Sequence, residues 1–196
     1  MLQEPTIQVT YKSLPGAVSE RALAEHVKLY EGYKKLNKRV DQKLMSTSPP
    51  DAPAVDTDYA LAMRNQSFGV SAAYLHELYF TGLSPNPSKN LSPELSKLIA
   101  DNYGDLEGCI QEIKNAAISA RGWSVLAYRV SGDDVDLRVF GVDSHEIGNV
   151  FGYTPLVIID AWEHAYWMDF GTSKSKYVDN VVGYIDWSVA SSRYIR

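Results

Sequence analysis

The sequence is poor in cysteine, in long apolar runs and in excess positive charge. Cys109 is the only cysteine among 196 residues, so the chain can form no intrachain disulfide and has no paired-cysteine zinc site. No apolar run approaches the roughly 20 residues that cross a bilayer, and the N-terminus lacks a signal-peptide pattern. We therefore expect a cytoplasmic protein with no membrane partner.

The charge balance argues against nucleic acid as a partner. The chain has 19 lysines and arginines against 24 acidic residues, and its basic residues are scattered rather than gathered in a stripe. A chain of this length buries roughly 70% of the surface that its unfolded form exposes, so its core needs no structural metal. Any bound metal is therefore expected to serve chemistry.

Helical spacing of apolar and aromatic residues dominates the first part of the chain. It predicts one helix over about 19–43 and a second over about 59–82. The densest cluster of turn residues follows at 83–90. We therefore expect an N-terminal helical hairpin domain over 1–90 and a C-terminal α/β domain over 91–196.

The second part of the chain mixes helices with β-branched and aromatic runs. Two further helices are expected, one beginning at Ser92 and one over 106–119. Short strands are expected after them, followed by two helices; the strands are 123–130, 135–142 and 155–160, and the helices are 161–170 and 181–194. The predicted class is α+β, with a three-stranded antiparallel sheet flanked by helices.

The segment from Asp160 to His164 carries the strongest chemical signal. A carboxylate at the end of the most apolar strand is costly unless it is paired or binds a cation. His164 follows one turn into the next helix, so the two side chains can face one point. His26 and His76, from the helical hairpin, can complete a set of three imidazoles and one carboxylate, which suits iron, manganese or zinc. For each histidine alone, a hydrogen-bonded core residue is the simpler interpretation.

Several motifs together resemble one family. Asp160-Ala-Trp-Glu-His-Ala-Tyr166 resembles the signature of the iron/manganese superoxide dismutases. Four other segments resemble that family's two helical ligand segments, its entry into the sheet and its final helix; they are His26-Val-Lys-Leu-Tyr-Glu-Gly-Tyr33, Leu75-His76-Glu-Leu-Tyr-Phe80, Arg121-Gly-Trp123 and Ile185-Asp-Trp187. The resemblance spans nearly the whole chain.

This resemblance implies a metal site, a reaction and an assembly. It implies that one manganese or iron ion per chain is bound by His26, His76, Asp160 and His164, and that superoxide and protons are converted to dioxygen and hydrogen peroxide. The family's other functional positions fall on residues around the ligands: Tyr33 as the gateway of the substrate funnel, Trp123 and Trp162 as apolar walls, and Glu163 and Tyr166 near the subunit interface. Glu163 would reach the partner subunit's His164 in a homodimer, with a tetramer as the larger alternative.

Two departures concern the second sphere of the site. Most members of the family place a glutamine beside the metal-bound solvent, at one of two positions that here hold Ala72 and His145. The resemblance therefore implies that His145 is the donor to that solvent, whereas a loop histidine without a role is the alternative. Tyr33 could likewise serve only helix packing.

Other departures concern the first helix and the funnel. The interval from His26 to Tyr33 is one residue shorter than in the common forms, which leaves Glu25 as a neighbouring alternative ligand. The family's histidine pair after the first ligand is replaced by Leu29-Tyr30, and its tyrosine after the signature by Trp167. These changes leave the effect on proton delivery open.

Two other functions fit part of the pattern. A metal-binding dimer of the same fold that has lost turnover would keep the ligands but alter the funnel. A non-haem iron oxygenase uses two histidines and one carboxylate, which leaves one histidine unexplained and requires a pocket for an organic substrate. Iron and manganese accept the same ligands, so the sequence does not choose between them.

Overall fold

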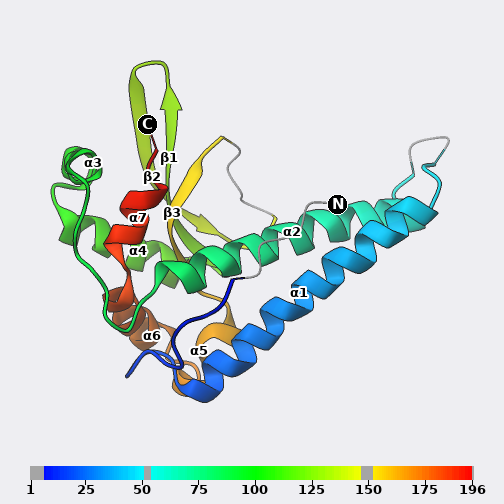
Figure 1. Ribbon diagram of the computed structural model, residues 1–196, viewed down its shortest axis with the longest axis horizontal. Coiled ribbons are helices and arrows are strands. Elements are labelled where there is room, and N and C mark those ends of the chain that lie inside the picture. Colours follow the sequence, from blue (N-terminus) through cyan, green and yellow to red (C-terminus); the bar gives the residue numbers. More distant parts are fainter. Residues whose placement is uncertain (1–6, 51–53, 147–151, 196) are drawn as a thin grey trace.

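The computed structural model describes residues 7–50, 54–146 and 152–195. Helices α1 (Glu20–Ser46) and α2 (Asp58–Gly82) form a long hairpin whose far end projects away from the rest of the molecule (Figure 1). The hydroxyls of Ser19 and Thr57 cap the two helices by accepting backbone N–H groups at 3.1 Å. Both helices begin within one residue of the predicted positions.

The rest of the chain surrounds a small sheet. Helices α3 (Pro93–Tyr103) and α4 (Leu106–Ser119) precede strands β1 (Trp123–Ser131), β2 (Asp134–Val142) and β3 (Thr154–Asp160). The strand order is β2-β1-β3 and both pairings are antiparallel. Helix α2 packs on β3, and α4 packs on β1 and β2. The predicted α+β class and three-stranded antiparallel sheet are confirmed.

The strand register brings one end of each of the three strands to the same edge of the sheet. Trp123, which begins β1, lies opposite Val142 at the end of β2 and opposite Asp160 at the end of β3. His145 follows β2 by three residues, so it emerges at the same edge. Because α2 packs against β3, this edge also faces the helical hairpin.

The C-terminal helices differ from the prediction. A single helix over 181–194 is wrong, because α6 (Lys174–Val181) and a 3-10 turn (Val182–Tyr184) end before a separate helix α7 (Trp187–Arg193). Ile185 forms an isolated bridge with Leu83, and the Asp186 side chain accepts the N–H of Ser188 to begin α7. The loop predicted at 171–175 is shorter, because α6 already begins at Lys174.

The core extends between the sheet and its helices. Leu126 and Leu156 on the sheet and Ile113 on α4 are fully buried. Because α2 packs on β3 as well as on α1, the helical hairpin shares this core. A division into two domains near residue 90 stays a prediction. Within the described ranges, no helix is both long and apolar enough to cross a membrane.

Candidate metal centre

Four side chains predicted as ligands converge at one point. They come from four elements: His26 from α1, His76 from α2, Asp160 from the end of β3 and His164 from α5 (Glu163–Phe170). Oδ2 of Asp160 lies 3.1 Å from Nε2 of His26, 3.6 Å from Nε2 of His76 and 3.1 Å from Nε2 of His164. The four donor atoms all lie within 4.8 Å of one another. Three of the residues are buried, and only His164 is partly exposed.

The chain turns at Asp160 in a way that places His164. Oδ1 of Asp160 accepts the backbone N–H of Trp162 at 2.9 Å, just before α5 begins at Glu163. This bond fixes the carboxylate and the turn that leads into the helix. His164 then lies four residues after Asp160, with its Nε2 beside the second carboxylate oxygen.

The spacing of the donor atoms fits one bound metal ion. Two ligands each about 2.1 Å from an ion lie roughly 3.0 Å apart at a right angle and about 3.6 Å apart at 120°. The observed distances from Asp160 to the three histidines cover this range. Nε2 of His76 is buried and has no hydrogen-bond partner within the described residues. A cation between these atoms would satisfy it.

Hydrogen bonding and burial put the donors in their metal-binding forms. Nδ1 of His76 donates to the carbonyl of Ala72 at 2.6 Å, which leaves the lone pair of Nε2 facing Asp160. Burial lowers the pKa of His76 to about 3 and also lowers the pKa of His26. Burial alone would raise the pKa of Asp160, but the interactions with His164 and His26 outweigh it and hold the pKa below its usual value. The two buried imidazoles are therefore neutral and the carboxylate is ionised.

The direction in which each side chain leaves α1 shows that His26, and not Glu25, is the candidate ligand. His26 is 2% exposed and faces Asp160, whereas the Glu25 side chain is 52% exposed and pairs with Lys28 at 2.6 Å. Glu25 therefore does not belong to the cluster. Tyr33, two turns after His26, lies on the same face of α1, with its ring 5.3 Å from that of His76.

His145 links Trp123 to Tyr33 beside the cluster. The indole N–H of Trp123 donates to Nδ1 of His145 at 3.1 Å, and Nε2 of His145 lies 3.1 Å from the hydroxyl of Tyr33. Because an indole can only donate, Nδ1 must be the accepting nitrogen and the ring proton sits on Nε2. Burial lowers the pKa of His145 to about 4, which keeps this ring neutral. Burial and the charge of Asp160 raise the pKa of Tyr33 to about 12.

Comparison with known proteins agrees with this geometry. Residues 91–193 match the family described as "Iron/manganese superoxide dismutases, C-terminal domain". The chain belongs to this family. It is 30% identical over 194 residues to "Superoxide dismutase [Fe]" of Aquifex aeolicus, a match covering 97% of this chain and 90% of that protein. It is also 30% identical over 193 residues to "Superoxide dismutase [Mn]" of Haloarcula marismortui, covering 97% and 92%. Relatives named for iron and for manganese thus match about equally well.

Aromatic side chains that the family resemblance singled out surround the cluster. The Trp162 ring stacks on His164, with centroids 6.4 Å apart and an interplanar angle of 15°. The guanidinium of Arg121 also lies over the Trp162 ring, 5.6 Å from its centroid. Tyr166 is buried and stacks on Tyr177, with ring centroids 5.6 Å apart.

The residues that depart from the family pattern lie on different sides of the helices. Tyr30 is buried and donates its hydroxyl to Glu77 at 2.8 Å, while Leu29 is half-buried. Trp167 is 51% exposed and follows the exposed Glu163 by one turn of α5. Trp167 and Glu163 therefore lie on the outer face of α5, beside the partly exposed His164.

One aromatic residue of the site was not predicted. The ring of Phe68 lies 4.8 Å from that of His145 and 5.8 Å from that of Tyr33. A sequence signal for it existed, because Phe68, Ala72 and His76 are spaced by four residues and share one face of α2. Ala72 is fully buried and supplies only its small side chain and its carbonyl.

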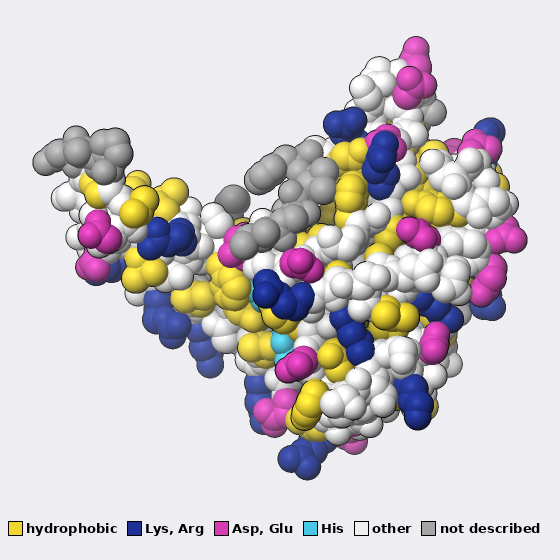
Figure 2. All heavy atoms as spheres, turned by 180° about the vertical axis from the view of Figure 1, so that it is seen from behind, with side chains coloured by type: hydrophobic (Ala, Val, Ile, Leu, Met, Phe, Trp, Pro, Cys, Tyr) yellow, Lys and Arg dark blue, Asp and Glu magenta, His cyan; other side chains and the backbone are white. Residues whose placement is uncertain are grey.

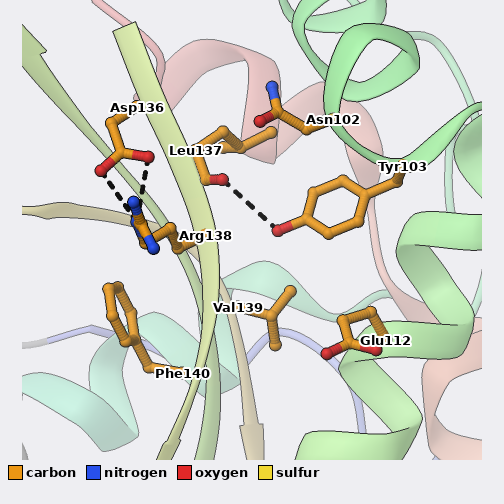
Figure 3. A pocket seen from close by; sticks show the side chains of 8 residues that line it. All are labelled: Asn102, Tyr103, Glu112, Asp136, Leu137, Arg138, Val139 and Phe140. Atoms are coloured by element: carbon orange, nitrogen blue, oxygen red, sulfur yellow. Dashed lines mark hydrogen bonds and ion pairs between the residues drawn. The ribbon is translucent and has the colours of Figure 1, made fainter.

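The metal cluster is largely buried, and a hollow elsewhere on the surface is separate from it. Figure 2 shows histidine only through a small opening bordered by hydrophobic and charged side chains. A cavity of about 410 Å³ lies instead between β2 and helices α3 and α4 (Figure 3). Its Arg138 is paired with Asp136 at 2.8 Å, and Tyr103 donates to the carbonyl of Leu137 at 3.5 Å. None of the predicted site residues lines this cavity.

Proposed function

We propose that the protein converts two superoxide ions and two protons to dioxygen and hydrogen peroxide, using one iron or manganese ion per chain. The observation that carries this proposal is the convergence of three imidazoles and one carboxylate beside the Tyr33–His145 contact. The ion, when bound, supplies one-electron redox chemistry by cycling between its trivalent and divalent states. His26, His76, Asp160 and His164 would hold it.

Tyr33 and His145 would manage the protons. The reaction needs two protons for each peroxide, and they must reach a largely buried site. Because Nε2 of His145 donates to the oxygen of Tyr33, the tyrosine proton is left to donate to substrate or water. The raised pKa of Tyr33 keeps this proton in place over the physiological range.

The apolar wall formed by Trp123 and Trp162 would exclude water from the site and limit what can enter it. Trp162 stacks on His164, and Trp123 packs edge-on against His76 with centroids 5.0 Å apart. Such packing places apolar ring surface against two of the histidines. The exposed Arg121 over Trp162 places one positive charge beside this wall.

The two alternative functions explain less of the geometry. A dimer that has lost turnover has no need of the Trp123–His145–Tyr33 chain, which is intact. An oxygenase with two histidines and one carboxylate leaves a third histidine idle, yet all three lie at similar distances from Asp160. Dismutation gives a role to Asp160, to all three histidines and to the Trp123–His145–Tyr33 chain.

We further propose a homodimer in which Glu163 accepts a hydrogen bond from the partner subunit's His164. The exposed Glu163, the exposed Trp167 and the partly exposed His164 lie on the same outer surface, which supports this pairing. Such a bond would orient His164 from outside the chain, as partners of metal-bound histidines do. The tetramer and the cytoplasmic location stay predictions from the sequence.

The direct test is superoxide dismutation by protein loaded separately with iron and with manganese. Metal content is measured on the same samples, and superoxide is generated in a pulse so that its decay is followed directly. We expect catalysed decay with at least one metal at one ion per chain. Full occupancy without catalysis by either metal would refute the proposal and favour the binding dimer.

A further inference from the structure

A pair of buried tyrosines reaches the ligand Asp160 from outside the metal cluster. Tyr177 of α6 and Tyr79 of α2 are 0% and 1% exposed, and neither takes part in the proton chemistry proposed above. The hydroxyl of Tyr177 donates to the backbone carbonyl of Asp160 at 2.8 Å. The hydroxyl of Tyr79 lies 3.1 Å from that of Tyr177.

The direction of these two hydrogen bonds follows from the number of protons. A carbonyl only accepts, so the single hydroxyl proton of Tyr177 is committed to Asp160. The bond between the tyrosines must therefore run from Tyr79 to Tyr177. Burial raises the pKa of both hydroxyls well above 10, so both protons stay in place. The result is a directed chain from Tyr79 through Tyr177 to Asp160.

This chain fixes the peptide that follows the ligand. The peptide joining Asp160 to Ala161 is held on both sides: its carbonyl accepts from Tyr177, and its N–H donates to the carbonyl of Gly122 at 2.8 Å. The carboxylate is attached to the same residue, and its Oδ1 is fixed by Trp162. With the peptide and one oxygen held, Oδ2 has little freedom left and stays on the three histidines.

The same chain joins the elements that carry the ligands. Tyr79 follows the ligand His76 by three residues on α2, and its ring lies 5.4 Å from that of His26. Tyr177 is held in turn by its stacking on Tyr166 of α5, the helix that carries His164. Two phenylalanines would fill this space with no buried hydroxyls to satisfy, so packing alone does not account for the tyrosines.

We infer that Tyr177 is a positioning residue for the metal, holding the Asp160 carboxylate on the histidine cluster through its hydrogen bond to the Asp160 carbonyl. The inference rests on the metal site and is independent of the reaction that the metal performs. Partners of this kind typically change metal affinity by about 10-fold to 100-fold when they are removed.

The test compares Tyr177→Phe with the matched control Tyr79→Phe. Tyr177→Phe removes the bond to Asp160, whereas Tyr79→Phe removes a hydroxyl of the same pair and leaves that bond intact. Manganese affinity is measured by competition with a chelator, the electron paramagnetic resonance of bound manganese is recorded, and unfolding of the metal-free protein by urea is followed. None of these measurements depends on superoxide, so a failed dismutase assay and a failed positioning role are distinguishable.

We expect Tyr177→Phe to lose about 10-fold or more in manganese affinity and to alter the resonance signal, with Tyr79→Phe within about 3-fold of the parent. The double variant Tyr79→Phe/Tyr177→Phe leaves no tyrosine hydroxyl unpaired, so it serves if Tyr177→Phe folds poorly, and it should show the same loss of affinity. Unchanged affinity and signal in the variants lacking the Tyr177 hydroxyl, or an equal loss in Tyr79→Phe, would overturn the inference.

Discussion

Trp123 donates its indole N–H to Nδ1 of His145 across 3.1 Å, and this one bond sets which ring nitrogen of the histidine carries the proton. A glutamine, which most of the family has near this place, offers two N–H donors, whereas a neutral imidazole offers one. His145 directs that one donor at Tyr33. The proton position in the site therefore depends on a fully buried tryptophan that begins β1.

Replacing Trp123 by phenylalanine should release His145 from this tautomer. The fold should survive at a cost of about 1–3 kcal/mol, because the smaller ring leaves part of a buried space empty. Nitrogen-15 NMR of the metal-free protein would report which nitrogen of His145 is protonated. We expect a mixture of the two neutral forms in Trp123→Phe. A ring that keeps its proton on Nε2 alone would show that Trp123 does not set the tautomer.

Tyr33→Phe should slow turnover while leaving the metal in place. The hydroxyl is removed from the proton route, and none of the four donor atoms is touched. Water can take over part of the transfer, so we expect a loss of about 10-fold, below the ~10²-fold typical of a positioned acid. Pulse measurements at several superoxide concentrations check this, with metal content measured in parallel. Full activity at equal metal content would remove Tyr33 from the mechanism.

The metal-free protein should lose stability in mild acid, partly through His145. The pKa of this residue is about 4 in the folded protein, because burial lowers it from its ordinary value of 6.5. Between these values the unfolded chain binds more protons, so stability is full above about pH 6.5 and falls as the pH is lowered toward 4. For His145 alone the loss between pH 7.5 and 5 is roughly 1–2 kcal/mol.

His145→Gln isolates this contribution, since glutamine does not titrate. Urea unfolding of the metal-free protein at pH 7.5 and at pH 5 gives the change in unfolding free energy for each form. The variant should show a smaller decline with acid than the parent does. An identical decline in both would mean that His145 is not held in its neutral form by the fold.

Gly122→Ala should damage the wall of the site. A Cβ at this position would lie 2.6 Å from the carbonyl oxygen of Val142 and 3.1 Å from Nε1 of Trp162. Backbone cannot yield cheaply, so we expect about 2 kcal/mol of destabilisation and a displaced Trp162. Chemical unfolding and indole fluorescence report the two effects. Gly32→Ala is the control, because Gly32 is exposed within α1 with open space around it and should gain stability.

Glu163→Ala should weaken the proposed dimer. The substitution removes the carboxylate that we assign to the partner subunit's His164 and leaves every donor of its own chain intact. Sedimentation across a concentration series should show a dissociation constant raised by about 30-fold or more, because truncating one partner of a buried, hydrogen-bonded charge pair costs about 2 kcal/mol or more at an interface. Glu112→Ala, which changes an exposed glutamate on a different helix, α4, should associate as the parent does. Equal association of both variants would contradict the bridge.

Local signals in the sequence were sufficient for most of the fold. Ser19, Thr57 and Ser92 all act as helix caps, as their residue types indicate, because capping depends on neighbours within three residues. The break between α6 and α7 was missed, since it depends on the pairing of Ile185 with Leu83, about 100 residues away.

The site shows the same difference between local sequence signals and contacts between distant residues. The pattern around Asp160 and His164 predicted the cluster, and the structure brings it together. Choosing His26 over Glu25 as the ligand required knowing which way each side chain points from the folded helix α1. Tyr79 and Tyr177 lie 98 residues apart, and nothing in their separate helices marks them as a pair. Contacts between distant elements follow from the topology and not from local pattern.

The most direct test of the account measures metal content and superoxide dismutation on the same samples of the parent protein and of Asp160→Ala. Asp160 is the group on which all three histidines converge, so its removal should abolish stoichiometric binding. We predict one iron or manganese ion per chain and catalysed dismutation in the parent, with both lost together in the variant. A variant that keeps its metal and its activity would contradict the assignment of this cluster as the catalytic metal site.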